Sequence, residues 1–156
     1  MNREFTVIIA DDHAIVREGL KLLISTIENV SVTGEAANGE ALLEFVRGTR
    51  IDLLVLDLGM PGVAGVHFIS AVRELAPRMK ILVLTANIEP RTVRAALDVG
   101  ANGYLTKDGD PEEIAAAIDA VRMAELTWRS RSDLRSTSRS GRVRRQRRRR
   151  LFRPFR

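Results

Sequence analysis

The chain of 156 residues has room for one domain and a short tail, and its hydrophobic content of 45% suits a packed core. It contains no cysteine, which excludes disulfides and thiolate metal sites and indicates a reducing compartment, so we expect a cytoplasmic protein. No apolar run approaches the ~18 residues of a membrane span and the N-terminus lacks a signal-peptide pattern, so no membrane partner is expected.

The formal net charge of +5 is unevenly distributed along the chain. Residues 1–127 carry 12 Lys and Arg against 19 Asp and Glu, whereas residues 128–156 carry 13 Arg and a single acid. This change predicts an acidic folded domain over 1–127, followed by a basic tail over 128–156. The tail has no apolar periodicity and its like charges repel, so we expect it to be disordered.

Five strand–helix pairs follow one another along the predicted domain. Strands are predicted where apolar residues run together, and helices where apolar residues recur every three to four positions. Asn38 is expected to cap the second helix, Pro90 to open the fourth, and Gly100 to end it. The predicted strands cover residues 5–10, 30–33, 51–56, 80–84 and 103–106.

The strict alternation of strands and helices predicts an α/β fold with a parallel sheet covered on both faces. The second and fifth strands are the least apolar, so we expect them at the two edges. The strand order 2-1-3-4-5 satisfies this condition and is that of a flavodoxin-like, doubly wound (βα)5 fold. The first and third strands are then neighbours at the switch point, outside whose carboxyl ends ligands bind.

Polar side chains follow four of the predicted strands at this edge. Asp11 and Asp12 end the first strand and Asp57 ends the third, while the fourth and fifth deliver Thr85 and Lys107. Three carboxylates at one edge repel one another and require a cation. Without sulfur or clustered histidine, the oxygen ligands suit Mg²⁺ or Mn²⁺. A carboxylate beside a hydroxyl, an ammonium group and a metal is the arrangement that transfer of a phosphoryl group onto that carboxylate requires.

One point about the acidic pair stays open. One interpretation is that Asp11 or Asp12 simply caps the following helix and reaches the metal through water, and the sequence does not decide which of them. His13, beside the pair, is interpreted as a residue at the helix start and not as a metal ligand.

The five positions Asp11, Asp12, Asp57, Thr85 and Lys107, each at a strand end, resemble the receiver domain of two-component response regulators. The resemblance covers about residues 3–125. Further motifs resemble the NarL/FixJ (LuxR-type) subfamily of these regulators: Asp-Asp-His-Ala-Ile-Val-Arg-Glu-Gly-Leu at 11–20, Asp-Leu-Gly-Met-Pro at 57–61 and Gly-Tyr-Leu-Thr-Lys-Asp at 103–108.

The resemblance implies that Asp57 accepts a phosphoryl group from a sensor histidine kinase or a small phosphodonor. It implies that Mg²⁺ is held by Asp11 or Asp12 together with Asp57 and the backbone carbonyl of Gly59, and that Lys107 pairs with the phosphate. Such a receiver is a phosphoacceptor and not an enzyme, apart from its own phosphorylation and dephosphorylation. Homodimers through an exposed helical face are also implied.

The resemblance further implies a switch. Thr85 would turn inward to bond the phosphoryl group and Tyr104 would follow it, repacking the face made by the fourth helix, the fifth strand and the fifth helix. That face would control an output that is ancestrally transcription. A half-buried tyrosine on an edge strand is also an ordinary finding, so the switch role of Tyr104 is one of two interpretations.

The tail after residue 127 is the largest departure from the subfamily, whose members usually continue into a helix-turn-helix domain that reads DNA. One hypothesis is a basic arm that binds nucleic-acid phosphates without sequence specificity. The other, which we favour, is an out-of-frame reading of GC-rich codons, with the output domain lost. Under the first hypothesis the contacts would come from Arg144, Arg145, Arg147, Arg148, Arg149 and Arg150.

A Mg²⁺-dependent phosphatase with an aspartate nucleophile is a third hypothesis, because such enzymes share the α/β architecture. They typically place a second acid two residues after the nucleophile. Here Gly59 occupies that position, which counts against turnover.

Overall fold

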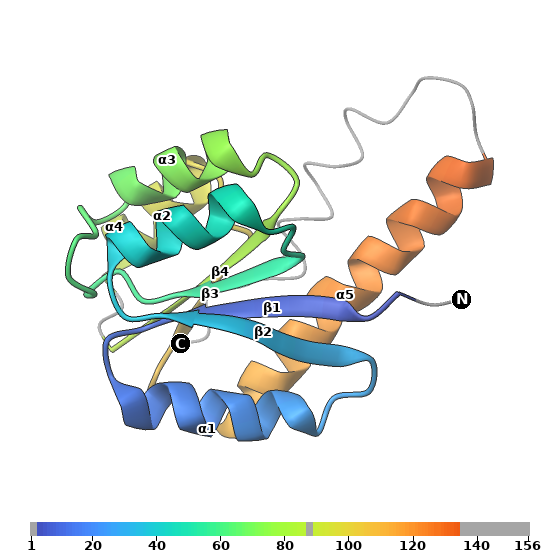
Figure 1. Ribbon diagram of the computed structural model, residues 1–156, viewed down its shortest axis with the longest axis horizontal. Coiled ribbons are helices and arrows are strands. Elements are labelled where there is room, and N and C mark those ends of the chain that lie inside the picture. Colours follow the sequence, from blue (N-terminus) through green and yellow to red (C-terminus); the bar gives the residue numbers. More distant parts are fainter. Residues whose placement is uncertain (1–2, 87–88, 135–156) are drawn as a thin grey trace.

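The computed structural model describes residues 3–86 and 89–134, and it describes side chains as far as Glu125. Five strands and five helices alternate over these residues (Figure 1). The strands are β1 Phe5–Ala10, β2 Val30–Ala36, β3 Leu53–Leu56, β4 Lys80–Thr85 and β5 Gly103–Thr106. The helices are α1 Ala14–Ser25, α2 Gly39–Gly48, α3 His67–Leu75, α4 Pro90–Asp98 and α5 Pro111–Leu134.

The sheet has the strand order β2-β1-β3-β4-β5, and every neighbouring pair is parallel. The predicted order and the predicted edge positions of the second and fifth strands are therefore confirmed. Register decides what meets at the carboxyl edge. Ala10 pairs with Leu56 and Thr85 pairs with Thr106, so the residues that follow these strands leave the sheet beside one another.

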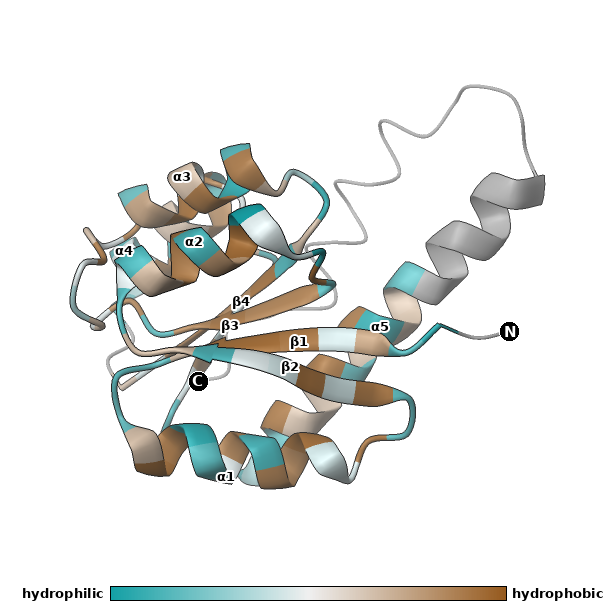
Figure 2. Ribbon diagram, in the orientation of Figure 1, coloured by the Kyte–Doolittle hydropathy of each residue, from teal (hydrophilic) through white to brown (hydrophobic). Residues whose placement is uncertain are grey.

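The helices form two layers, with α2, α3 and α4 on one face of the sheet and α1 and α5 on the other (Figure 1). Successive residues of β3 alternate between the layers: Leu54 and Leu56 join the core under α2, α3 and α4, while Leu53 and Val55 join the core under α1 and α5. The central strands are accordingly hydrophobic along their length, and the helices mainly on their inner sides (Figure 2). Burial of each such side chain contributes about 1.5–3 kcal/mol, which gives the site a rigid support.

The predicted helix boundaries are largely those of the structure. The side chain of Asn38 accepts a hydrogen bond from the backbone N–H of Ala41 at 2.8 Å, and Pro90 opens α4. Gly100, just past α4, has a φ of 118°, a conformation that favours glycine. At α1 the cap position belongs to His13, which makes no side-chain cap bond, so neither member of the acidic pair is the cap residue.

Helix α5 continues to Leu134, beyond the predicted domain boundary at residue 127. Residues 128–134 are therefore helical, and the expectation of disorder does not hold for them. A growing helix gains one hydrogen bond per added residue, so a change in charge does not by itself end it. Residues 135–156, with the six predicted contact arginines, lie outside the described residues. Among the described helices, none combines the length and the hydropathy of a membrane span.

Candidate functional site

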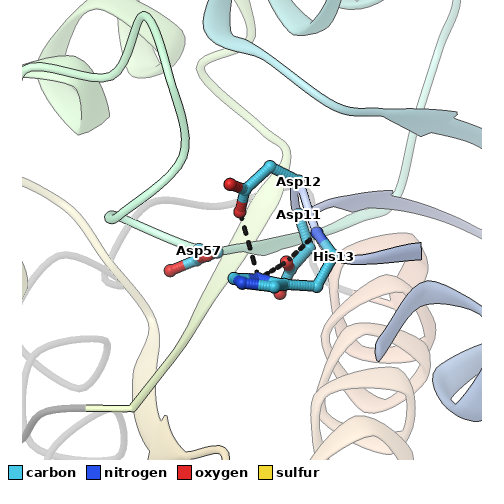
Figure 3. Close-up of side chains that lie close together, drawn as sticks. All are labelled: Asp11, Asp12, His13 and Asp57. Atoms are coloured by element: carbon cyan, nitrogen blue, oxygen red, sulfur yellow. Dashed lines mark hydrogen bonds and ion pairs between the residues drawn. The ribbon is translucent and has the colours of Figure 1, made fainter. Parts of the chain in front are cut away.

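Acidic residues from two strands meet at the carboxyl edge of the sheet. Asp57 follows β3, and its backbone N–H donates to the carbonyl of Ala10 at 2.9 Å, which holds it beside the end of β1. Asp11 is 2% exposed and Asp57 is 5% exposed, whereas Asp12 is open to solvent. One ligand atom from each of Asp11, Asp12, His13 and Asp57 lies within 4.8 Å of the others (Figure 3). The predicted meeting of the three aspartates is therefore observed.

Lys107 joins the two buried aspartates. Its Nζ lies 2.6 Å from Oδ2 of Asp11 and 3.0 Å from Oδ2 of Asp57. The backbone N–H of Lys107 donates to the carbonyl of Thr85 at 2.8 Å, which ties the end of β5 to the end of β4. The side chain thus extends from the end of the edge strand β5, past β4, to the predicted nucleophile at the end of β3.

The electrostatics of this contact are visible in two opposite pKa shifts. Burial works to raise the pKa of the Asp11 carboxyl, but hydrogen bonds from Lys107 and from His13 outweigh it and hold the pKa below its ordinary value. Burial likewise works to lower the pKa of the Lys107 ammonium, but the hydrogen bonds to Asp11 and Asp57 raise it overall. Both groups are therefore charged at neutral pH, as an ion pair.

The cluster holds more negative charge than its cation compensates. Asp11, Asp12 and Asp57 carry three negative charges and Lys107 carries one positive charge, which leaves a formal charge equal and opposite to that of a divalent cation. All of the carboxylate donors are hard oxygen atoms, which Mg²⁺ and Mn²⁺ prefer. Gly59 also lies here, since its backbone N–H donates to Oδ1 of Asp57 at 2.9 Å. The residues present fit such an ion.

The His13 side chain contacts both Asp11 and Asp12, which the sequence did not indicate. Its Nδ1 lies 3.0 Å from Oδ1 of Asp11 and 3.2 Å from Oδ1 of Asp12, while its side chain is 65% exposed (Figure 3). Its backbone N–H also donates to Oδ1 of Asp11 at 2.8 Å. The prediction that His13 stands at the helix start is correct, and its contact with both carboxylates is an addition to it.

Thr85 and Tyr104 lie next to each other on β4 and β5. Thr85 is partly exposed at its strand end, and Tyr104 is 6% exposed within the core under α2, α3 and α4. Burial raises the pKa of the Tyr104 phenol above its ordinary value of 10.0; a side-chain hydrogen bond with Thr85 works against this rise, and the charge of Asp57 adds to it. The Tyr104 side chain is therefore inward and within the electrostatic reach of the predicted nucleophile.

One residue beside the site carries no signal in the sequence. Arg17, in the first turns of α1, donates from Nη1 to the backbone carbonyl of Asp11 at 2.7 Å and from Nε to Oε1 of Glu35 at 3.1 Å. An arginine on an amphipathic helix is ordinarily interpreted as part of a solvated face. Only the close approach of α1 to β2 turns it toward the site.

A parallel α/β sheet with these groups at its carboxyl edge defines a receiver domain. Residues 7–119 match the response regulator receiver domain family, and the chain belongs to that family. It contains the receiver domain of a response regulator in a two-component system, a family whose members act mainly as signalling switches. The predicted family and fold are both confirmed.

The relatives place the chain near particular regulators. It is 37% identical to the nitrate/nitrite response regulator protein NarL of Escherichia coli K12 over 121 residues, which are 78% of this chain and 56% of NarL. It is 32% identical to the response regulator UvrY of Escherichia coli K12 over 115 residues, or 74% of this chain and 53% of UvrY. The chain thus spans about half the length of these curated relatives.

A solved relative is the isolated receiver domain of RcsB from Salmonella enterica serovar Typhimurium with the phosphomimetic BeF3⁻. The two are 33% identical with a TM-score of 0.73, over 78% of this chain and 90% of that one. A two-component response regulator of the LuxR family from Aurantimonas is also similar, with 34% identity and a TM-score of 0.71 over 76% of this chain and 84% of that one. The predicted LuxR-type resemblance agrees with these neighbours.

Proposed function

We propose that Asp57 accepts a phosphoryl group from a sensor histidine kinase in a Mg²⁺-dependent reaction in the cytoplasm, and that the phosphorylated domain controls an output. The observation that carries this proposal is the single ammonium group of Lys107 between the buried carboxylates of Asp11 and Asp57, with Asp12 close by. Such a site is short of positive charge, and a divalent cation would offset both the excess of the three carboxylates and the negative charge that a phosphoryl group brings.

In the proposed step, a carboxylate oxygen of Asp57 attacks the phosphorus of a phosphohistidine. The phosphorus–oxygen bond to Asp57 forms while the phosphorus–nitrogen bond breaks, and the histidine leaves with that electron pair and takes up a proton. Lys107 lies 3.0 Å from the Asp57 carboxylate already, so it is in place to pair with the transferred oxygens. A small phosphodonor would react in the same way.

Asp11, Asp12, Asp57 and the backbone carbonyl of Gly59 are the proposed holders of the metal. Bound there, Mg²⁺ would neutralise the equatorial oxygens of the phosphoryl group, and Mn²⁺ would be an acceptable replacement. Burial of Asp11 and Asp57 supports this role, because charges in a site shielded from water interact more strongly than charges in bulk solvent.

We further propose that Thr85 and Tyr104 report the phosphorylation. A phosphoryl oxygen on Asp57 would compete for the hydroxyl of Thr85, which is bonded to Tyr104 before the reaction. Since Tyr104 packs in the core with Val93 and Ala96 of α4, a change at Thr85 would alter the packing between α4 and β5. This is a local charge event that biases a packed surface.

The output we propose is transcription, together with pairing of two copies. RcsB has been solved bound to a promoter and as two dimers on two parallel DNAs, and YhcZ of Bacillus subtilis, 39% identical over 108 residues, is named a transcriptional regulatory protein. The alternative of a nucleic-acid-binding regulator acting through the basic tail gains no support from the comparisons, which match the receiver. A sensor histidine kinase and a second copy are the proposed partners, with DNA a partner only through the basic tail or, ancestrally, through a lost helix-turn-helix domain.

The test is phosphorylation of the full chain by acetyl phosphate, followed by intact mass spectrometry. We expect the wild type to gain one phosphoryl group with Mg²⁺ and none with a chelator, and Asp57→Asn to gain none. The matched control is Asp119→Asn, which removes a carboxylate that is 47% exposed on α5 and pairs with Arg122. Labelling of Asp57→Asn to the extent of the wild type would refute the assignment.

A further inference from the structure

Asp11 is held at both of its backbone polar groups by the edge strand β2. Its N–H donates to the carbonyl of Ala36 at 3.0 Å. Its carbonyl accepts from Arg17 at 2.7 Å, and Arg17 is in turn fixed by Glu35 at 3.1 Å. Glu35 and Ala36 are consecutive residues at the end of β2. This short stretch of the edge strand therefore holds the turn that carries the acidic pair, directly through Ala36 and through Arg17 from Glu35.

We propose that Arg17 is a positioning residue, whose guanidinium couples Glu35 to the Asp11 carbonyl and thereby sets the direction of the Asp11 and Asp12 carboxylates. This inference rests on the proposed function, because it assigns Arg17 a task in binding Mg²⁺. Within the part of the chain that the structure describes, the hydrogen bonds of Arg17 go to the Asp11 carbonyl and to Glu35, so Arg17 acts on the acidic pair through the backbone of the turn.

The chemistry of the side chain suits this task. A guanidinium is a planar fork whose donors have fixed directions, so a single side chain can hold two acceptors in one geometry. Arg17 uses Nη1 for the carbonyl and Nε for Glu35, and its side chain is only 20% exposed. A lysine carries the same charge on a single rotatable ammonium group and lacks this fork.

Positioning and simple electrostatics predict opposite signs. Removal of a positive charge near three carboxylates should strengthen the binding of a cation if charge alone matters. Loss of a residue that orients metal ligands should weaken it, and such losses typically cost about tenfold or more in metal affinity. The direction of the change therefore identifies the role of Arg17.

Lys21 provides a matched control on the same helix. Its Nζ lies 3.2 Å from Oε2 of Glu35 and 2.6 Å from Oε1 of Glu18, one helical turn beyond Arg17. It shares the Glu35 partner and the unit charge of Arg17, but its ion pairs with described residues go to Glu18 and Glu35 and not to Asp11. Lys21→Gln thus removes the same charge from the same acid without releasing the turn.

The experiment is a calorimetric titration of the full chain with Mg²⁺. We expect the dissociation constant of Arg17→Gln to rise about tenfold, with that of Lys21→Gln unchanged or slightly lower. Arg17→Lys should stay weak, because it keeps the charge and loses the fork. An Arg17→Gln variant that binds Mg²⁺ as tightly as the wild type, or an Arg17→Lys variant that restores full affinity, would overturn the proposal.

A second measurement separates this inference from the proposed function. If the wild type binds no Mg²⁺, the proposed function fails, and the turn is then followed by the amide NMR signals of Asp11, Asp12 and His13. These signals should move in Arg17→Gln and not in Lys21→Gln; unmoved signals would contradict the positioning role. If Arg17→Gln does not fold, Glu35→Gln, which keeps the guanidinium and weakens its anchor, should change both measurements in the same direction.

Discussion

Strand β3 is bracketed by two buried aspartates that have different partners. Asp52, just before the strand, is 8% exposed and accepts from the backbone N–H of Thr6 at 2.9 Å, from the Thr6 hydroxyl at 3.1 Å and from Arg3 at 2.7 Å. Asp57, just after the strand, shares its cation, Lys107, with Asp11 and has further carboxylates beside it.

The comparison separates two uses of a buried carboxylate. At Asp52 one negative charge meets one cation and two donors of β1, so the interactions are balanced and tie two strands together. At Asp57, among the described residues, three carboxylates share the one ammonium group of Lys107, so negative charge is in excess and a further cation would offset it. Burial alone therefore does not mark a functional acid, whereas burial together with uncompensated like charge does.

The largest effect on stability is expected at the balanced end. Asp52→Ala leaves the N–H and hydroxyl of Thr6 without this acceptor and should lower the free energy of unfolding by about 1–3 kcal/mol, the usual cost of unsatisfied buried donors. Urea unfolding measures it. Arg3→Gln should cost less, because Arg3 is 43% exposed and water replaces it. An unchanged urea midpoint for Asp52→Ala would contradict the stabilising role assigned to Asp52.

The next effect is stabilisation by Mg²⁺, which should depend only on the carboxyl end. At a free concentration ten times the dissociation constant, a ligand that binds only the folded state adds about 1.4 kcal/mol. Thermal unfolding with and without Mg²⁺ should show this gain for the wild type and for Asp52→Ala. Asp57→Asn should lose most of it. An equal gain in all three proteins would mean that the ion binds elsewhere.

A smaller effect, of opposite sign to that of Asp52→Ala, is expected for Asp57→Asn without divalent cations. Asp57 has one cationic partner, Lys107, a hydrogen bond from the backbone N–H of Gly59, and two carboxylate neighbours, Asp11 and Asp12. Neutralising it should therefore raise the free energy of unfolding by on the order of 1 kcal/mol or less. The amide oxygen can still accept from Gly59, and Lys107 keeps Asp11. Urea unfolding in chelator would contradict this if the variant lost as much stability as Asp52→Ala.

The carboxyl end of the strands was predictable from the sequence, and the amino end was not. Alternation and strand hydrophobicity specify the sheet order, and the sheet order brings Asp11, Asp57 and Lys107 together because each directly follows a strand. The partners of Asp52 lie 46 and 49 residues away and depend on the register of β1 against β3, which hydrophobic patterns do not encode. The sequence predicts where strands end, but not which side chains form hydrogen bonds and ion pairs at the beginning of each strand.

The contacts of two helix arginines were also not predictable from the sequence. Arg73 of α3 donates to the Gly100 carbonyl at 2.6 Å and to Oδ1 of Asn102 at 3.1 Å, linking the end of α3 to the start of β5. Like Arg17, it occupies a polar position of an amphipathic helix, where the pattern indicates only exposure. A long side chain takes its partners from whatever backbone packs beside the helix, and that is known only after the helices have been placed.

The smallest effect is on the pKa of Tyr104, which should respond to the charge of Asp57 after β3 but not to that of Asp52 before it. Tyr104 is the only tyrosine in the chain, so its ionisation can be followed directly by ultraviolet absorbance. Burial should put the midpoint above 10.0, with a further rise in Thr85→Val, which loses the bond that lowers the pKa, and a fall in Asp57→Asn, which loses a charge that raises it. Asp52→Ala, at the other end, should leave it unchanged.

The sign for stability follows from the same shift. Because the pKa of the folded state lies above that of the unfolded state, the contribution of Tyr104 is fully present below pH 10 and is lost as the pH rises through the folded pKa. The difference in stability between the wild type and Tyr104→Phe, which also loses the bond to Thr85, should therefore change with pH only in that range. A midpoint at or below 10.0, or one that responds to Asp52→Ala as it does to Asp57→Asn, would contradict an inward phenol coupled to the carboxyl edge.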